Sequence, residues 1–469
     1  MRLQNTLTGA LEELVPVIPG KIGIYVCGVT PYDAAHVGHA MSLIVYDVLV
    51  RYLRWPGNPS GGLDVTFVSN YTDVDDKLID RGAALGLDPL DLANQNIVQW
   101  EDEQDRLGLL KPDVRPRVSL EIENIVAMTA EIVANGFGYV TPSGDVYFRV
   151  RAKDDYGKLS HRNIDDLRSG TRFEPGDEKE FALDFALWKA AKPGEPAWDS
   201  PWGRGRPGWH IECSAMSRRT LGERFDIHGG GLDLIFPHHE NEIAQAEAAA
   251  NADHPVFANI WMHNGMVQRD GEKMSKSIGN VVSVEEALSR WSPDAIRLYV
   301  LSSHYRSRNN LTDEAMAAAG AGVERLVRAV TRDARTDTGG ARLEASEGAR
   351  DSDFIEAMED DLDTSHALAV LFRLAGAINR AIDAEANGDD VRAMQATLGE
   401  LAGILGLSLD EAASDERDDA DEIDALLRER TEARASRNFA RADEIRAELD
   451  ARGIVIEDTP QGARWSVKR

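Results

Sequence analysis

The fold is decided near the start of the chain by an apolar run that ends at a glycine, Lys21-Ile22-Gly23-Ile24-Tyr25-Val26-Cys27-Gly28. A run of this kind is typical of a strand buried inside a sheet. An apolar stretch over residues 40–55, closed by Pro56-Gly57, predicts a helix, and residues 63–68 predict a second strand. Strand, helix and strand at this spacing form a βαβ unit, so the sequence predicts an α/β domain with a parallel sheet. Ligands of such sheets bind at the carboxyl ends of the strands.

The length and composition limit the class of protein. The chain has 469 residues, whereas single hydrophobic cores stop growing near ~250–300 residues, so we expect several domains. Its hydrophobic fraction of 43% and charged fraction of 28% are typical of a globular protein and argue against a disordered or fibrous one. No apolar run reaches the ~18 residues that a membrane span needs, and the two cysteines lie too far apart for a disulfide-stapled secreted scaffold. We therefore expect a cytoplasmic protein with no membrane partner.

The net charge of −28 at first argues against a nucleic-acid partner, because phosphate binding needs clustered Lys and Arg. The acidity is concentrated, however. Residues 351–424 contain 21 acidic and 4 basic side chains, whereas residues 428–469 contain 10 basic and 8 acidic ones. The global charge therefore leaves room for a locally basic surface elsewhere.

The sequence pattern changes along the chain. From about residue 116 to 205, a hairpin signal around Pro142-Ser143-Gly144-Asp145 and an irregular stretch interrupt the α/β pattern, which predicts an inserted domain. Beyond Leu311 the pattern is helical almost throughout. A helix over 425–452 and two short strands are predicted to close the chain.

Two short strings contain residues suited to phosphate chemistry. His36-Val37-Gly38-His39 lies at a predicted helix N-terminus, which favours anions, but alone it is better explained as a turn with surface histidines. Lys273-Met274-Ser275-Lys276-Ser277 lies between two glycines, and its lysines can reach a triphosphate and neutralise a leaving pyrophosphate. A solvated basic loop is the alternative for the second string. Both strings in one chain argue against coincidence and indicate nucleotidyl transfer.

Four further residues have the chemistry of metal ligands. Cys27 ends the first predicted strand, Cys213 lies far downstream, and His238 and Glu242 are four residues apart on one face of a predicted helix. Two thiolates, one imidazole and one carboxylate form an allowed but uncommon tetrahedral zinc set. The alternative is that both cysteines are inert core residues, which free cysteines often are. That alternative weakens because Cys27 lies at a strand's carboxyl end, close to His36.

With these motifs, the chain resembles the cysteinyl-tRNA synthetases, which are class I aminoacyl-tRNA synthetases, over essentially its whole length. The matching strings are Tyr25-Val26-Cys27-Gly28-Val29-Thr30, His36-Val37-Gly38-His39, Asn70-Tyr71-Thr72-Asp73-Val74-Asp75-Asp76-Lys77, Asp184-Phe185-Ala186-Leu187-Trp188-Lys189, Gly208-Trp209-His210-Ile211-Glu212-Cys213, Asp226-Ile227-His228-Gly229-Gly230-Gly231, the loop around Lys273, Phe439-Ala440-Arg441-Ala442-Asp443 and Glu457-Asp458-Thr459-Pro460-Gln461-Gly462.

The resemblance implies an activity and a domain order. The activity is ATP-dependent conversion of L-cysteine to cysteinyl-adenylate and its transfer to tRNA(Cys), with one Zn²⁺ per chain, ATP with Mg²⁺ as substrate, and a monomeric enzyme. The fold implied is a Rossmann-like catalytic domain with a connective insertion, followed by a helical bundle and a small mixed domain. The predicted boundaries are 1–115 with 206–265 for the catalytic domain, 116–205 for the insertion, 266–311 for a stem-contact region, 312–413 for a tRNA-binding bundle and 414–469 for an anticodon-side domain.

The resemblance also implies roles for particular residues. Cys27, Cys213, His238 and Glu242 match the family's zinc ligands, and Gly28, Thr72 and Trp209 match positions of its cysteine pocket. His36 and His39 match the first class I signature, which holds ATP phosphates, and Lys273 and Lys276 match the second, with Lys276 the usual ATP contact. Gly230 and Asp233 resemble residues near the adenosine ribose. The chain departs from the family at Met41-Ser42, where an arginine is common.

Zinc gives a physical reason for selectivity. Serine differs from cysteine by one atom, and so small a packing difference is worth only ~1–3 kcal/mol. A soft thiolate binds zinc far better than a hydroxyl does, so we expect discrimination without a separate editing site.

Three alternatives remain open at this point, of which the third is an additional cysteine persulfide activity. The first alternative to a synthetase is the related ligase that joins cysteine to glucosaminyl-inositol in mycothiol synthesis, which has no need of the region after Leu311. A second is an inactive paralogue that binds tRNA or zinc, against which both signatures and all four ligand types argue. Arg297, Arg306 and Arg308 beside Tyr305 are either a tRNA contact or a surface charge cluster.

Overall fold

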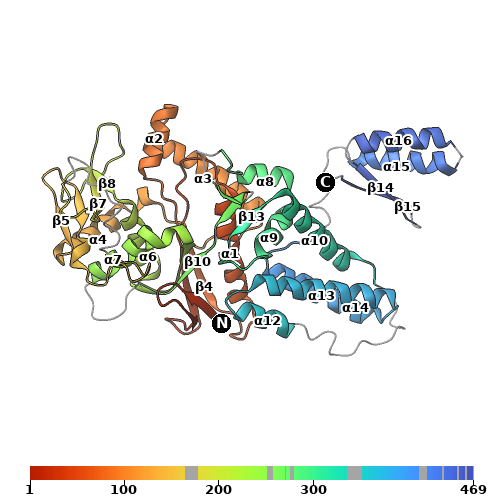
Figure 1. Cartoon of the computed structure of the whole chain (residues 1–469), viewed down its shortest axis with the longest axis horizontal. Helices are drawn as coiled ribbons and strands as arrows, with labels where there is room; N and C mark the ends of the chain where they lie inside the picture. The colour runs from red at the N-terminus through yellow and green to blue at the C-terminus, as the bar shows by residue number, and fades with distance from the viewer. Residues whose placement is uncertain are drawn as a thin grey trace. The chain divides into compact units, whose positions relative to one another are not determined.

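The computed structural model of the chain describes residues 1–163, 178–250, 257–269, 271–274, 279–334, 351–410, 420–435, 438–451, 454–459 and 462–467. The chain divides into two compact units, Met1–Ser408 and Leu409–Arg469 (Figure 1). Among the described residues, no helix combines the length and the apolar character that a membrane crossing requires.

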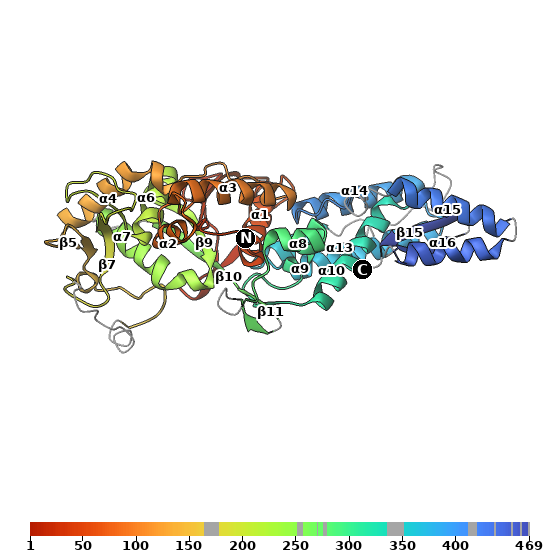
Figure 2. The ribbon, with the colours of Figure 1, turned by 90° about the horizontal axis from the view of Figure 1, so that it is seen from above.

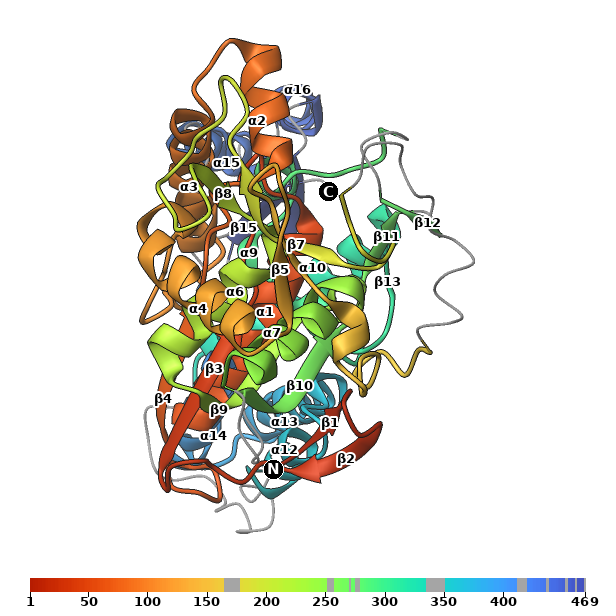
Figure 3. The same cartoon turned by 90° about the vertical axis from the view of Figure 1, so that its left-hand side faces the viewer.

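A four-stranded parallel sheet forms the centre of the first unit, with strand order β10-β9-β3-β4 (Figure 3). Its strands are β3 (Lys21–Val26), β4 (Asp64–Ser69), β9 (Arg224–Gly231) and β10 (Phe257–Asn264). Ile24 pairs with Phe67 on one side and Ile227 on the other, and all three are buried. Helices cover both faces of a parallel sheet. Its strands are therefore buried on both sides and consist of continuous apolar runs. The α/β prediction is confirmed.

Helix α1 (Val37–Arg54) connects β3 to β4 and begins earlier than the predicted residue 40. The reason is local, because the His36 side chain accepts a hydrogen bond from the Gly38 amide and caps the helix. The same unit contains α2 (Asp76–Leu85), α3 (Pro89–Arg106), α6 (Trp209–Leu221) and α7 (Glu240–Ala250), and the N-terminal hairpin of β1 (Arg2–Asn5) and β2 (Ala10–Glu13), which lies against β10.

Between β4 and β9 the chain forms a second sheet, which is antiparallel with order β5-β6-β7-β8. Its strands are β5 (Gly138–Val140), β6 (Val146–Phe148), β7 (Phe185–Ala190) and β8 (Gly205–Pro207), accompanied by η1 (Val118–Leu120), α4 (Ile122–Ala134) and η2 (Val150–Ala152). The predicted hairpin is the β5–β6 pair, in which Tyr139 faces Tyr147.

The rest of the first unit is mostly helical. A small sheet of β11 (Val267–Arg269), β12 (Glu272–Lys273) and β13 (Asn309–Leu311) precedes the bundle. The helices are α8 (Val284–Arg290), α9 (Pro293–Leu301), α10 (Asp313–Thr331), α12 (Asp351–Glu359), α13 (Thr364–Asp383) and α14 (Gly388–Ile404). Figures 1 and 2 place these helices and the inserted sheet on opposite sides of the central parallel sheet.

The second unit contains α15 (Ala420–Ala435), α16 (Phe439–Ala451) and a hairpin of β14 (Ile454–Thr459) and β15 (Gly462–Val467). The prediction of a single helix over 425–452 was wrong, because two helices occupy this range. Their apolar residues pack together in a core of Ile423, Leu427, Ile445, Leu449 and Ile454. A single straight helix cannot bring Ile423 next to Leu449, which explains the break.

Candidate metal centre and substrate cavity

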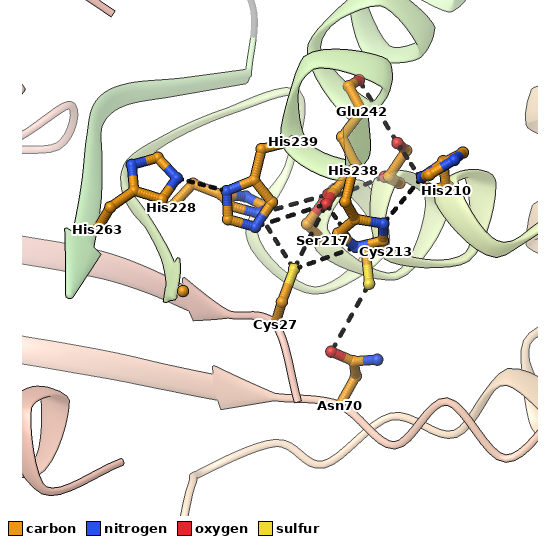
Figure 4. A network of polar contacts seen from close by, with 12 residues as sticks. Cys27, Asn70, His210, Cys213, Ser217, His228, His238, His239, Glu242 and His263 are labelled. Atoms are coloured by element: carbon orange, nitrogen blue, oxygen red, sulfur yellow. Dashed lines mark hydrogen bonds and ion pairs between the residues drawn. The ribbon is translucent and has the colours of Figure 1, made fainter. Parts of the chain in front are cut away.

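A cluster of thiol, imidazole and carboxylate groups lies at the carboxyl end of β3 (Figure 4). The Cys27 Sγ lies 3.6 Å from the His238 Nε2 and 3.4 Å from the Glu242 Oε1. The His238 Nε2 lies 3.0 Å from the same carboxylate oxygen. His238 and Glu242 thus share one face, as their spacing predicts, although a short π-type turn, η5 (Ile235–His239), leads into α7.

Cys213 reaches the same cluster from the first turns of α6 and is buried. Its Sγ lies 3.8 Å from the Asn70 Oδ1. A hydrogen bond from the Cys27 thiol lowers the pKa of Cys213 to about 6, whereas burial raises the pKa of Cys27. Burial alone would lower the pKa of His238, but the charge of Glu242 together with the interactions with Cys213 outweighs it and raises that pKa. The structure therefore gathers Cys27, His238 and Glu242 in one cluster, in which the fourth member is His239, and Cys213 lies beside it in contact with Cys27 and His238.

Two further histidines join the cluster and were missed in the sequence. The His228 Nε2 lies 3.4 Å from the Cys27 Sγ and 3.4 Å from the Glu242 Oε2. The His239 ring shares a hydrogen bond with the His263 ring, in which the His239 Nδ1 and the His263 Nε2 lie 2.8 Å apart. Burial lowers the pKa of His239 and His263, so both rings are neutral near pH 7. The sequence gives only a weak indication that His228 belongs to the cluster, namely its position near the carboxyl end of a parallel strand.

The polar atoms of the cluster fit a divalent cation. Within the described part of the protein, the buried His239 Nε2 and Glu242 Oε2 form no hydrogen bond, although the latter lies 3.4 Å from the His228 Nε2. Buried polar atoms normally have partners, so unpaired ones indicate a missing ion or ligand. Soft sulfur and imidazole donors in this combination suit zinc.

A cavity of about 340 Å³ opens beside the cluster. Cys27, Gly28 and Trp209 line it, and the Trp209 ring stacks on His238 with centroids 4.2 Å apart. A Cβ on Gly28 would lie 1.6 Å from the Asn70 carbonyl oxygen, so only glycine allows this close approach. Thr72 is buried, and its Oγ1 accepts a hydrogen bond from the Asn70 Nδ2 at 3.4 Å.

The two strings that are predicted to bind phosphate converge on the same cavity. His36, His39 and Met274 line it, and a Cβ on Gly38 would lie 3.9 Å from the Met274 Cε. Lys273 belongs to β12, next to Met274, whereas Lys276 lies outside the described residues.

Of the two residues that the resemblance places near the ribose, Asp233 lines the cavity, whereas Gly230 is not among its lining residues. The Gly230 amide donates to the Tyr46 hydroxyl, and a Cβ on Gly230 would lie 2.8 Å from Leu234.

The suggestion that Arg297 contacts tRNA was wrong, because this side chain is fully buried. It forms an ion pair with Asp47 and donates to the Leu405 and Leu107 carbonyls. Arg306 is partly exposed and pairs with Asp361 at 2.7 Å.

Comparisons with known proteins agree with this geometry. Residues 13–321 match the family described as "tRNA synthetases class I (C) catalytic domain", residues 353–410 match the DALR domain, and residues 417–465 match the "Cysteinyl-tRNA ligase anticodon binding domain". A protein of Halorhodospira halophila named cysteine–tRNA ligase is 48% identical over 99% of each chain. Proteins of the same name from Nitratidesulfovibrio vulgaris and Dehalococcoides mccartyi are each 46% identical over the whole of both chains.

Among solved structures, methionyl-tRNA synthetase of Mycobacterium tuberculosis in complex with methionyl-adenylate is similar, with a TM-score of 0.57. The similarity covers 83% of this chain and 90% of that one at 17% identity, so it supports the fold alone.

Proposed function

This chain belongs to the cysteine–tRNA ligase family of class I aminoacyl-tRNA synthetases, and we propose that it joins L-cysteine to tRNA(Cys) by way of cysteinyl-adenylate. The observation that carries the proposal is one cavity that both the Cys27 cluster and the His36–His39 string line. A substrate amino acid bound near the cluster then lies beside the nucleotide that activates it. The mycothiol-pathway ligase is not favoured, since an anticodon-binding domain matches residues 417–465 and full-length relatives are cysteine–tRNA ligases.

In this proposal Cys27, His238 and Glu242 of the cluster, together with the adjacent Cys213, hold one Zn²⁺. The ion, when bound, supplies a soft Lewis acid that takes up a thiolate in preference to a hydroxyl. Glu242 and the cysteines contribute the negative charge that the ion needs. Trp209 and Gly28 line the part of the cavity that receives the rest of the amino acid. Thr72 fixes the Asn70 side chain through its hydrogen bond.

The remaining predicted residues act on ATP, which enters with Mg²⁺. His36 and His39 face the cavity at the N-terminus of α1, where backbone amides favour phosphate oxygens. Lys273 and Lys276 neutralise the charge that develops on pyrophosphate, and Gly230 and Asp233 receive the ribose. The cysteine carboxylate attacks the α-phosphate and pyrophosphate leaves. A terminal ribose hydroxyl of the tRNA then attacks the carbonyl of cysteinyl-adenylate, takes the cysteinyl group and releases AMP. Most of the acceleration comes from positioning and charge neutralisation.

Pyrophosphate exchange into ATP tests the first half of the reaction. We expect exchange that depends on cysteine and one zinc per chain by elemental analysis. A pocket that distinguished cysteine from serine by size alone would favour cysteine by only about 10–200-fold in kcat/KM. A kcat/KM ratio of cysteine over serine above that range supports selection by zinc, and a ratio within it contradicts this part of the proposal.

Charging assays test the second half. The full chain is expected to charge tRNA(Cys) and to leave glucosaminyl-inositol unused. Consumption of the sugar with no charging of tRNA would establish the alternative ligase. The same preparation is expected to sediment as a monomer, and a tagged copy is expected in the cytoplasm.

A further inference from the structure

Lys77 is a positive side chain on the cavity wall to which no role has yet been given. It is the second residue of α2 and lines the cavity together with Cys27 and His36. Its Nζ lies 5.3 Å from the centroid of the Tyr32 ring, which lines the same cavity. Within the described parts of the chain, no carboxylate forms an ion pair with Lys77. A lysine over an aromatic face is held in place, yet its ammonium protons stay available to an anion.

The acidic neighbours of Lys77 are already engaged. Asp75 caps α2 by accepting a hydrogen bond from the Lys77 amide at 2.8 Å. Asp76 pairs with the Lys189 Nζ and the Arg206 Nη2, each at 2.5 Å. Burial alone would raise the pKa of Asp76, but the hydrogen bonds from Lys189 and Arg206 outweigh it and lower that pKa. These contacts attach the first turn of α2 to the inserted sheet and leave the charge of Lys77 for a ligand.

The other charged residues of the cavity wall do not substitute for Lys77. Arg115 donates to the Glu101 Oε1 at 2.9 Å and to the Gln104 Oε1 at 3.0 Å. The Glu101 carboxylate therefore already balances its positive charge. Asp233 repels phosphate. Lys77 is therefore the best placed side-chain cation among the described lining residues for binding an anionic ligand.

We propose that Lys77 binds a phosphate group of the substrates. This inference rests on the proposed function, which brings two phosphates to the cavity. One is the α-phosphate of ATP and cysteinyl-adenylate, and the other is the terminal phosphodiester of tRNA(Cys). A lysine binds phosphate as a flexible point charge and forms a charge-assisted hydrogen bond with it.

The test compares the full-length protein with Lys77→Ala, Lys77→Arg and Lys21→Ala. Lys21 is the matched control, because it is an exposed lysine paired with Asp64 at the opposite, amino end of β3.

For an α-phosphate contact, Lys77→Ala lowers kcat/KM of cysteine-dependent pyrophosphate exchange by about 10–100-fold. For a phosphodiester contact, exchange is unchanged, and single-turnover transfer from preformed cysteinyl-adenylate to tRNA(Cys) slows by a similar factor. Lys77→Arg recovers most of the loss in either arm, and Lys21→Ala stays within about twofold of the parent.

Two results overturn the inference. One is an unchanged rate of both exchange and transfer in Lys77→Ala. The other is an equal loss in Lys77→Ala and Lys77→Arg, since a role of the charge requires rescue by arginine. Equilibrium dialysis of ATP and thermal melting accompany the rates, so that a folding defect is recognised. If the parent protein itself fails to exchange with cysteine, the proposed function fails; if the parent is active and Lys77→Ala is equally active, only this inference fails.

Discussion

The cluster around Glu242 and the pair of Arg297 with Asp47 are both buried and charged, yet they satisfy their charges differently. Asp47 accepts hydrogen bonds from the Leu110 amide at 2.7 Å and the Arg51 Nε at 2.9 Å, besides its ion pair with Arg297. Arg297 in turn donates to backbone carbonyls on two sides. The Glu242 cluster instead leaves buried polar atoms without partners among the described residues.

This difference teaches how to recognise a site. A buried charge that the fold satisfies by itself holds elements together, and here it joins α1, α9 and the end of α14. A buried cluster that the fold leaves incomplete requires something from outside the protein. Both consist of residues that rarely lie in a core, so residue type alone does not distinguish them.

The largest expected effect concerns the satisfied pair. Replacing Arg297 with Met leaves the buried Asp47 carboxylate without its main counter-charge, which costs about 3–5 kcal/mol of unfolding free energy. Urea denaturation of the full chain measures it. The double variant Arg297→Met with Asp47→Leu is expected to regain part of the loss, because no unpaired charge is then buried. A single-variant cost below about 1 kcal/mol would contradict the structural role given to this pair.

The next effect concerns the incomplete cluster. Glu242→Gln is expected to lower zinc affinity by at least about 100-fold, since even residues beyond the ligands contribute 10–100-fold. Competition with a chelating dye measures this affinity without reference to activity.

Glu240→Gln is the matched control for Glu242→Gln, because Glu240 is equally buried on the same helix. Its carboxylate accepts hydrogen bonds from the Gly157 amide at 3.0 Å and the Ser160 amide at 2.8 Å. Glu240→Gln is therefore expected to cost stability, about 1–3 kcal/mol, while zinc binding persists. Equal zinc loss in both variants would remove the distinction between a ligand and a structural carboxylate.

The smallest effect concerns an exposed pair. Arg332, the C-cap residue of α10, contacts Asp383 at the end of α13 at 2.5 Å, but the two side chains are 42% and 64% exposed. Arg332→Met is expected to change the free energy of unfolding by about 0–1 kcal/mol, because water and salt screen such pairs. Urea denaturation in low and high salt checks this. A cost comparable to that of Arg297→Met would show that exposure does not separate the two ion pairs.

Several features followed from local sequence. The run 21–27 and the helix after it predicted the parallel sheet because apolar periodicity is a property of neighbouring residues. The four-residue spacing of His238 and Glu242 placed them on one face for the same reason. The hairpin around Gly144 was equally local. The break between α15 and α16 was missed, since it depends on how the two helices pack together.

The residue strings and their family membership determined the sheet, the class of enzyme and the four candidate zinc ligands. Only the tertiary structure decided that Arg297 is buried, that His228 and His239 join the cluster, and that Lys77 faces the cavity. The physical reason is that burial and the pairing of charge are set by segments far apart in the chain, such as α1 with α9 and β3 with α7. A sequence records which groups are present, whereas the fold decides which of them are left without a partner.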